Sequence, residues 1–165
     1  MNETKKLRVA LFFGGVSSEH EVSCVSASTW LRALAQAPCA DRYEVFPVGI
    51  TKQGRWLACS PTPEAMADGS WEKGADCTPC VLSPDRTDHG IWLLKDGKAK
   101  LVHIDICAPV MHGKNGEDGT IQGLFELARI PYVGCGVLGS AVCMDKAVAN
   151  TIMDAAGVPH CKWAS

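Results

Sequence analysis

Two glycine-rich segments carry most of the side chains that could do chemistry. Residues 14–23 read GGVSSEHEVS and residues 112–119 read HGKNGEDG, and each segment follows an apolar run. Glycines let a ligand approach the backbone, and the N–H groups that begin a helix bind anions. Acidic side chains at the same place disfavour a bare phosphate and favour an ammonium group. Loops that offer both N–H donors and carboxylates therefore indicate a site for a zwitterion such as an amino acid.

Glu19 and His112 are the strongest individual candidates. Glu19 could pair with an ammonium group, and His112 stands directly after an apolar run and before a glycine, where loop residues often bind ligands. The alternative for Glu19 and Asp118 is that each carboxylate only stabilises the positive end of a helix. The alternatives for His112 and Lys146 are a structural imidazole and a solvated lysine, and His20 is expected at the surface.

The spacing of other residues disfavours competing chemistry. Cys77 and Cys80 form a CxxC pair, but no second pair accompanies it and the nearest histidine is His89. A zinc or redox site is therefore not expected. The Gly14-Gly15 loop does not match GxGxxG, and no P-loop, GxSxG or HExxH motif is present, which argues against a dinucleotide site. No metal ligands are predicted.

A βαβ unit is expected to position the first of these segments. The continuous apolar run 8–13 is typical of a strand covered on both faces. Ser18 and Glu21 fit a capping box, so a helix should begin with Ser18 as its N-cap and end before Pro38. Residues 43–50 (YEVFPVGI) form the next predicted strand.

The pattern weakens between residues 51 and 100. Residues 54–57 and 90–95 are predicted to be short strands of a hairpin. They are separated by a stretch at 60–88 that is rich in proline, serine and aspartate. This region is interpreted as an insertion or flap on the main sheet, with a mobile middle.

The second segment follows another predicted strand, at residues 105–111, and a helix should begin near Thr120. Residues 131–133 predict a short strand, and Ser140 is expected to cap a last helix that ends at Gly157. The apolar stripe of that helix consists of Met144, Val148, Ile152 and Ala155. The predicted fold is α/β, with an open, mainly parallel sheet flanked by helices and a β-hairpin or loop insertion.

Composition excludes several classes of protein. The chain has 165 residues, 47% of them hydrophobic and 21% charged, and a net charge of −2, so it is expected to be globular and offers no basic surface for nucleic acid or an anionic membrane. No stretch is long enough to cross a bilayer, and the run 9–13 is too short for a secretory signal. The 9 cysteines are therefore expected to be reduced thiols in a cytoplasmic protein.

Three motifs resemble consecutive motifs of the D-alanine–D-alanine ligase family, which belongs to the ATP-grasp superfamily. They are residues 14–23, residues 112–123 (HGKNGEDGTIQG) and residues 136–146 (GVLGSAVCMDK). The resemblance covers almost the whole chain and is weakest at 51–100. It implies a Rossmann-like, pre-ATP-grasp domain over residues 1–136 that binds the first substrate. Residues 137–165 would be the start of the ATP-grasp region, truncated here.

The resemblance also implies an ATP-driven reaction for peptidoglycan synthesis. The carboxylate of one D-alanine attacks the γ-phosphate of ATP, and the amine of a second D-alanine displaces phosphate from the acyl phosphate, with Mg²⁺ neutralising charge. Glu19 is the implied catalytic residue and pairs with the ammonium group of the first D-alanine. Val22 and His112 line that subsite, and Lys146 reaches the ATP phosphates.

Members of the resembled family are longer, and their metal-binding carboxylates and nucleotide clamp have no counterpart in these 165 residues. The chain is therefore expected to be an N-terminal part that is inactive alone, binds neither ATP nor Mg²⁺ by itself, and leaves the apolar face of its last helix without a partner. A ligase that joins D-alanine to D-lactate or D-serine stays open, as does a non-catalytic small-molecule binding module. A homodimer is the implied assembly, with no nucleic acid or membrane partner.

Overall fold

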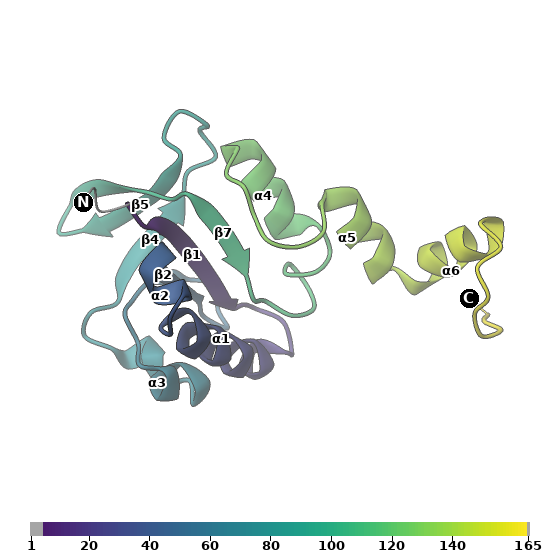
Figure 1. The fold of residues 1–165 in the computed structure, drawn as a ribbon, viewed down its shortest axis with the longest axis horizontal. Helices are drawn as coiled ribbons and strands as arrows, with labels where there is room; N and C mark the ends of the chain where they lie inside the picture. The colour runs from purple at the N-terminus through teal and green to yellow at the C-terminus, as the bar shows by residue number, and fades with distance from the viewer. Residues whose placement is uncertain (1–4, 165) are drawn as a thin grey trace.

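An open sheet with helices on both faces forms the body of the molecule, and two further helices form an arm at the C-terminal end (Figure 1). The computed structural model describes residues 5–164. Within that range the sheet has seven strands in the order β6-β5-β4-β3-β2-β1-β7. The predicted α/β class with an open, helix-flanked sheet is confirmed. The strands are β1 (Leu7–Gly14), β2 (Tyr43–Ile50), β3 (Trp56–Ala58), β4 (Thr78–Leu82), β5 (Gly90–Lys95), β6 (Lys98–His103) and β7 (Ile106–Pro109). The helices are α1 (His20–Leu34), α2 (Cys39–Arg42), α3 (Pro63–Ala67), α4 (Thr120–Ala128), α5 (Val137–Met144) and α6 (Lys146–Ala155), with a 3₁₀ turn η1 (Ser70–Lys73).

The parallel part of the sheet consists of β2, β1 and β7. β1 pairs with β2 along its whole length and with β7 over residues 9–12. Strands buried on both faces read as continuous apolar runs, which is why the sequence predicts β1 and β2 close to their observed bounds. The predicted strand at 131–133 is reduced to an isolated parallel bridge between Cys107 and Tyr132.

Residues 51–100, expected as an insertion, extend the sheet itself. β3, β4, β5 and β6 pair antiparallel with their neighbours, so the sheet is mixed rather than mainly parallel as expected. The strands predicted at 54–57 and 90–95 are observed as β3 and β5, but they do not pair with each other because β4 lies between them. The stretch at 60–88 buries Met66 and Trp71 in the core, and the Trp71 ring packs at 4.8 Å from that of Phe13.

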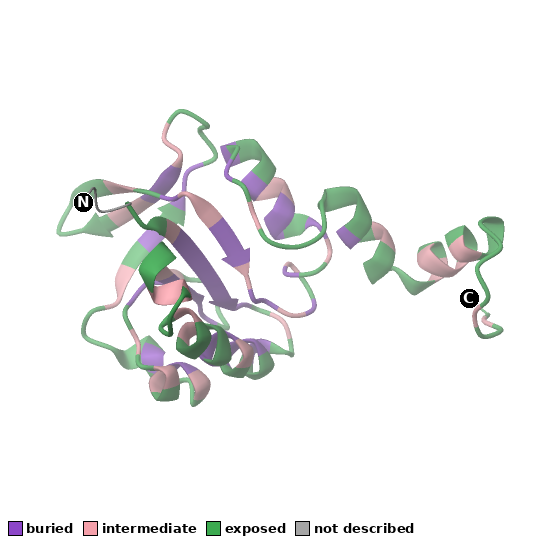
Figure 2. Cartoon of the chain, viewed as in Figure 1, coloured by how far each residue is buried: buried purple, intermediate pink, exposed green. Residues whose placement is uncertain are grey.

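Buried residues lie in the central strands and in the helices on both faces of the sheet (Figure 2). One cluster joins Leu11 and Phe13 of β1 to α1, α3 and η1. The other joins Ala10 and Phe12 of β1 to α4, which buries Phe125 at 5.2 Å from the Phe12 ring. Alternate residues of β1 thus serve two cores, because successive side chains of a strand point to opposite faces.

The capping box predicted for α1 is wrong. The helix begins at His20, with Glu19 in the N-cap position and no side-chain cap hydrogen bond, so Ser18 is not the cap. Glu21 forms an ion pair with Lys52 instead of closing a capping box. The S-x-x-E pattern is present, but the Glu21 carboxylate pairs with Lys52, which is distant in the sequence.

The prediction that Ser140 caps the last helix is also wrong. Ser140 lies inside α5, which ends before Asp145. The carboxylate of Asp145 accepts hydrogen bonds from backbone N–H groups in the first turn of α6. α6 ends as predicted, with Gly157 in the left-handed conformation at φ +67° just beyond it. One apolar stripe over residues 144–155 looked continuous in the sequence, although it belongs to two helices.

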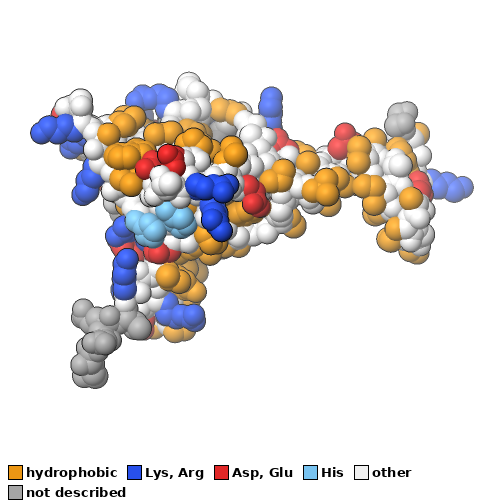
Figure 3. All heavy atoms as spheres, turned by 90° about the horizontal axis from the view of Figure 1, so that it is seen from above, with side chains coloured by type: hydrophobic (Ala, Val, Ile, Leu, Met, Phe, Trp, Pro, Cys, Tyr) orange, Lys and Arg blue, Asp and Glu red, His pale blue; other side chains and the backbone are white. Residues whose placement is uncertain are grey.

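α5 and α6 lead away from the sheet (Figure 1), and apolar side chains lie on their surface (Figure 3). Met144, Val148 and Ile152 are 42%, 42% and 48% exposed, and Ala155 is exposed as well. The apolar stripe is therefore exposed to solvent in this structure. None of the helices described within residues 5–164 is long and apolar enough to cross a membrane.

Candidate functional site

The two glycine-rich loops lie side by side because β1 and β7 are adjacent parallel strands. Loops that leave the carboxyl ends of neighbouring parallel strands meet at one edge of the sheet, where ligands bind in open α/β folds. Gly14 and Gly15 have φ of +81° and +105°, values that side-chain-bearing residues rarely adopt. A Cβ atom on Gly14 would collide with the carbonyl oxygen of Ile50. The tight turn from β1 toward α1 thus depends on glycine.

Two serine hydroxyls connect the first loop to the second. Ser23 Oγ, which is buried, accepts a hydrogen bond from Gly14 N at 2.8 Å and donates one to Val110 O at 2.5 Å. Ser17 Oγ donates to the carbonyl oxygen of His112 at 2.7 Å. A hydroxyl donates and accepts at once, so Ser23 satisfies the backbone groups of two strand ends with one side chain.

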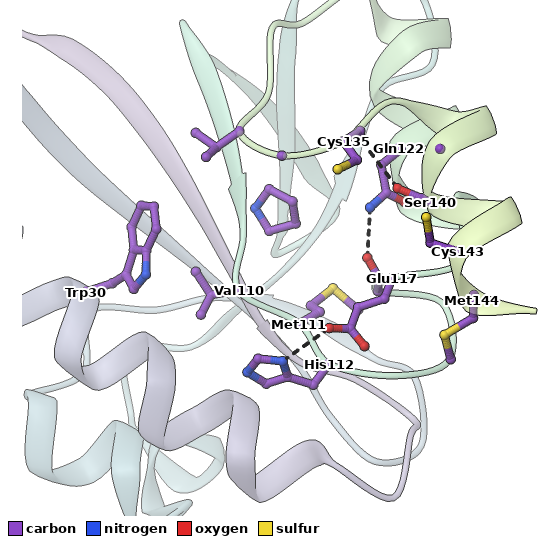
Figure 4. Close-up of a pocket in the computed structure, with 15 residues that line it drawn as sticks. Trp30, Val110, Met111, His112, Glu117, Gln122, Cys135, Ser140, Cys143 and Met144 are labelled. Carbon is purple, nitrogen blue, oxygen red and sulfur yellow. Dashed lines mark hydrogen bonds and ion pairs between the residues drawn. The ribbon is translucent and has the colours of Figure 1, made fainter. Parts of the chain in front are cut away.

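The imidazole of His112 has a polar neighbour at each ring nitrogen. Nε2 lies 3.0 Å from Ser26 Oγ, and Nδ1 lies 3.6 Å from Glu117 Oε1, the contact drawn in Figure 4. Glu117 is itself fixed, because its Oε2 accepts a hydrogen bond from Gly113 N at 2.8 Å. A carboxylate only accepts, so it favours a proton on Nδ1 and leaves Nε2 to accept from Ser26. The ring is therefore held in one orientation while it stays partly exposed.

Glu19 is exposed, and its carboxylate lies against Gly113 of the second loop. A Cβ atom on Gly113 would collide with Glu19 Oε2, and Gly113 has φ +68°. Across residues 5–164, no Lys, Arg or His nitrogen lies within ion-pair distance of this carboxylate. The structure thus brings Glu19 beside the residue that follows His112 and leaves its charge available to an external cation.

A cavity of about 540 Å³ opens beside the second loop (Figure 4). Its lining combines His112, Glu117 and Gln122 with the apolar side chains of Trp30 and Met111. Gln122 donates through Nε2 to Gly116 O at 2.8 Å, and its buried Oε1 has no hydrogen-bond partner among the described residues. Glu19 does not line this cavity. The two loops therefore adjoin without placing both predicted side chains in one enclosed space.

The other two predicted site residues are placed differently. Val22 lies on α1 one turn after Glu19 and is 53% exposed, so it faces solvent near the loops. Lys146 is the exposed first residue of α6, on the arm that leads away from the carboxyl ends of β1 and β7 (Figure 1). Lys146 does not line the cavity beside the second loop, although Met144, two residues before it, does.

The carboxylate of Asp118 shapes the second loop. Its Oδ2 accepts a hydrogen bond from Asn115 N at 2.8 Å, and its Oδ1 accepts one from Thr120 N at 3.0 Å. Burial raises the pKa of Asp118, but these hydrogen bonds outweigh burial and hold the pKa below its ordinary value. Asp118 therefore has a structural role at the start of α4, which is the alternative that the sequence left open.

His20 is buried, contrary to the surface position expected for it. It is 4% exposed, and its Nδ1 lies 2.7 Å from Gly15 O. Its Nε2 lies 3.7 Å from Glu72 Oε1. The contact with Gly15 O supports the glycine turn and gives the buried imidazole a hydrogen-bond partner, which is why a polar side chain is tolerated there.

The serines at positions 17, 23 and 26 are the functional residues that the sequence did not single out. Ser23 and Ser26 are three residues apart and therefore share a face of α1, which is the only signal the sequence offers. Their partners lie 87 and 86 residues away in the chain, so no local pattern reveals them.

The residues described here provide no metal site. In the part of the chain from 5 to 164, no group of three or more His, Cys, Asp or Glu side chains could hold a metal ion. The acidic residues of the second loop instead bind backbone N–H groups of that loop. The chemistry that the site supports is recognition of a small charged molecule by a carboxylate, an oriented imidazole and glycine backbone.

Comparisons with known proteins show the family of this chain. A family model described as "D-ala D-ala ligase N-terminus" matches residues 8–135. The "D-alanine--D-alanine ligase" of Caldicellulosiruptor bescii is 49% identical over 94% of this chain and 41% of that protein. The "Putative D-alanine--D-lactate ligase" of Streptomyces coelicolor is 46% identical over 93% of this chain and 41% of that protein.

A solved structure shares the fold. The VanG D-Ala:D-Ser ligase from Enterococcus faecalis matches with a TM-score of 0.84 and 38% identity, over 93% of this chain and 43% of that one. The chain therefore spans about two fifths of the length of the curated relatives it matches, 41% of each of the two named above.

Proposed function

The chain belongs to the family of D-alanine–D-alanine ligase N-termini, and from this premise we propose that it is the first-substrate domain of an ATP-dependent ligase. The ligase joins two D-alanines for peptidoglycan synthesis. The observation that carries the proposal is the placement of the Glu19 carboxylate against Gly113, next to the oriented imidazole of His112. An amino acid is a zwitterion, and this pair of loops offers a carboxylate to its ammonium group.

Each residue of the proposed subsite has a distinct task. Glu19 pairs with the ammonium group of the first D-alanine, because no cation among the described residues competes for it. Val22 follows Glu19 by three residues on α1, which places both on one side of the helix and lets Val22 contact the methyl group of D-alanine. His112 belongs to the adjoining second loop, where Ser26 and Glu117 hold its ring, and in the proposal it completes the subsite from that side.

ATP and Mg²⁺ are the proposed co-substrate and metal of the whole ligase. The described residues alone do not fit them, since they hold no metal-ligating cluster and Lys146 does not line the cavity beside the second loop. No phosphoryl-transfer step is therefore assigned to these residues. In the proposal, Lys146 contacts ATP phosphates only together with the parts of a ligase that the relatives have beyond the matched two fifths.

The second substrate has three candidates within the family. We favour D-alanine, and D-lactate or D-serine are the alternatives because two of the matched proteins carry those substrates in their names. A competition assay that offers all three to the ligase distinguishes them by the mass of the product. Cytoplasmic location and a homodimer stay predictions.

The test of the proposed function joins residues 1–165 to the remaining part of the related C. bescii ligase. We expect the fusion to form D-alanyl-D-alanine from ATP and D-alanine, and the 165-residue chain alone to release no ADP. Glu19→Gln should raise the KM for the first D-alanine about 10- to 100-fold, the size of a lost charge-assisted hydrogen bond.

Glu21→Gln is the matched control, because Glu21 lies on the same helix but pairs with Lys52. The control should keep the KM of the unmodified fusion. A Glu19→Gln fusion with unchanged D-alanine kinetics would contradict the assignment of Glu19. An unmodified fusion that binds D-alanine no better than L-alanine would contradict the proposed function itself.

A further inference from the structure

Cys59 and Cys77 face each other at the end of the β3–β4 ladder. The register pairs Leu57 with Pro79 and Ala58 with Thr78, so the next opposing pair is Cys59 with Cys77. The hydrogen bond from Ser60 N to Asp76 Oδ2, at 2.8 Å, holds the two chain segments together one residue further on. The two cysteines therefore occupy directly opposite positions on antiparallel chains.

The backbone geometry brings their Cα atoms close. Cys59 N donates to Pro47 O of β2 at 3.2 Å, so the backbone groups of Cys59 point toward β2 and away from β4. Opposing residues whose backbone groups point away from each other form the narrow pairs of an antiparallel ladder, with Cα atoms about 4.5 Å apart. That spacing lies within the range of about 4.4–6.8 Å that disulfides span.

Both side chains also point to the same face of the sheet. Cys59 belongs to the cluster of Leu11, Met66 and Trp71, and Cys77 packs against that cluster. Cys80, the other half of the CxxC pair, belongs to the cluster on the opposite face. The partner of Cys77 is thus the cysteine across the ladder and not the one three residues along the chain.

Each thiol has a backbone acceptor, because Cys59 Sγ donates to Leu57 O at 3.5 Å and Cys77 Sγ donates to Trp71 O at 3.1 Å. Burial raises the pKa of Cys77, and the neighbouring Cys59 thiol lowers this pKa in part. Burial also raises the pKa of Cys59, and the nearby Cys77 adds to that rise. Cys77 is half-buried, whereas Cys59 is 5% exposed, so an oxidant in solution reaches Cys77 first.

We propose that Cys59 and Cys77 are a modification site, at which a low-molecular-weight disulfide such as oxidised glutathione converts the two thiols into a disulfide. The Cys77 thiolate attacks one sulfur of the oxidised glutathione, whose S–S bond breaks and releases one glutathione thiolate. The Cys59 thiolate then attacks Cys77 Sγ in the mixed disulfide, and the second glutathione leaves. The two protons lost by the cysteines go to the two glutathione thiolates, so two cysteine thiols are oxidised and one glutathione disulfide is reduced.

The disulfide closes a loop that contains α3 and η1. These elements bury Met66 and Trp71 against α1 and β1, and a covalent link at the base of the loop restricts the unfolded chain. Since burial raises the pKa of both thiols, exchange should be slow at neutral pH and faster as the pH rises.

The experiment equilibrates the 165-residue chain, purified with reductant, in oxidised glutathione at pH 7 and at pH 9. Remaining thiols are then alkylated, and the chain is digested and analysed by mass spectrometry. The exposed residues Cys135, Cys143 and Cys161 are replaced by serine in a parallel sample to remove their reactions. We expect a peptide pair linked through Cys59 and Cys77 as the main intramolecular disulfide, formed faster at pH 9, and a Tm higher by about 6–12 °C than that of the reduced chain.

Three variants make the result specific. Cys59→Ala and Cys77→Ala should each abolish the linked peptide and the rise in Tm, and Cys77→Ala should also remove the mixed disulfide with glutathione. Cys80→Ala, the matched control in β4, should leave the Cys59–Cys77 link unchanged. Glutathione held at Cys77 without transfer to Cys59, a Cys77–Cys80 link, or two free thiols at equilibrium in the unmodified chain would each overturn the proposal.

Discussion

Ser23 offers the sharpest test of how the two loops are held together. Ser23→Ala removes the hydroxyl that accepts from Gly14 N and donates to Val110 O. Both backbone groups are then left buried without this partner, and an unsatisfied buried group costs about 1–3 kcal/mol. The variant should therefore lose about 2–5 kcal/mol of the free energy of unfolding, measured by urea unfolding at equilibrium.

Ser28→Ala is the matched control, because Ser28 is equally buried on the same helix. Its hydroxyl donates to Val25 O and accepts from the Arg32 guanidinium at 3.3 Å, both on its own helix, so it joins no separate segments and its loss should cost less than about 1 kcal/mol. A Ser23→Ala variant as stable as Ser28→Ala would refute the argument that Ser23 joins the loops. Hydrogen exchange gives a second readout, since the Gly14 amide should lose protection in Ser23→Ala and keep it in the control.

Three further predictions concern the second loop, the end of the sheet and the arm. Gly113→Ala should cost about 1–2 kcal/mol of unfolding free energy and displace the Glu19 side chain, whereas Gly97→Ala, at a similar φ of +72° but in open space, should show the backbone strain alone in urea unfolding. The pKa of Asp105 is held below its ordinary 3.8, first by a backbone hydrogen bond from Arg8 N–H. The ionised carboxylate therefore adds to the free energy of unfolding above about pH 4, and this contribution is lost as the pH falls through the lowered pKa. Asp105→Asn should therefore flatten acid unfolding below about pH 4, and an unchanged acid profile would count against it. Asp145→Ala should destabilise α6 by about 1 kcal/mol, seen as faster amide exchange confined to that helix; exchange that rises across the whole chain would contradict a local capping role.

The sequence predicted the parts of the fold whose signals are local. The run 8–13 and the run 43–50 appear as β1 and β2 because parallel strands covered on both faces are apolar throughout. β3 was predicted at 54–57, two residues ahead of its observed start, and β4 and β6 were missed. β3 and β4 have only 3 and 5 residues and no clear alternation. Pairing across the loop at 60–76, which defines them, is a long-range property.

Capping patterns misled for the same reason. Ser18 with Glu21 and Ser140 before an apolar stripe both match N-cap signals, yet Glu21 pairs with Lys52 and Ser140 lies within α5. Asp145, the observed cap of α6, sits in the middle of an apolar stripe that looked unbroken. A pattern shows which bonds a side chain could make, and distant residues decide which bonds it does make.

The sequence predicted which two loops form the candidate site, but it did not predict the hydrogen bonds that hold their side chains in place. Glycines after apolar runs locate Glu19 and His112 at strand ends, because the connection rules of α/β folds place them there. The contact between Ser26 and His112 joins residues 86 apart in the chain, and only the folded chain shows it. The sequence therefore identifies candidate ligand-binding groups more readily than the groups that orient them.

The apolar character of β1 has a consequence for how the chain finds its alignment. A strand with one solvent-exposed face resists a register shift of one residue, because the shift would expose its apolar side chains to solvent. β1 buries Ala10 through Phe13 on both faces and lacks that safeguard. Two hydrogen bonds at the ends of β1 fix its register instead. Arg8 N donates to the Asp105 carboxylate, and Gly14 N donates to the Ser23 hydroxyl. The Ser23 hydroxyl, which joins the loops, thus also helps to set the register of β1. Loss of this hydroxyl should therefore produce refolded molecules with β1 out of register before it affects ligand recognition.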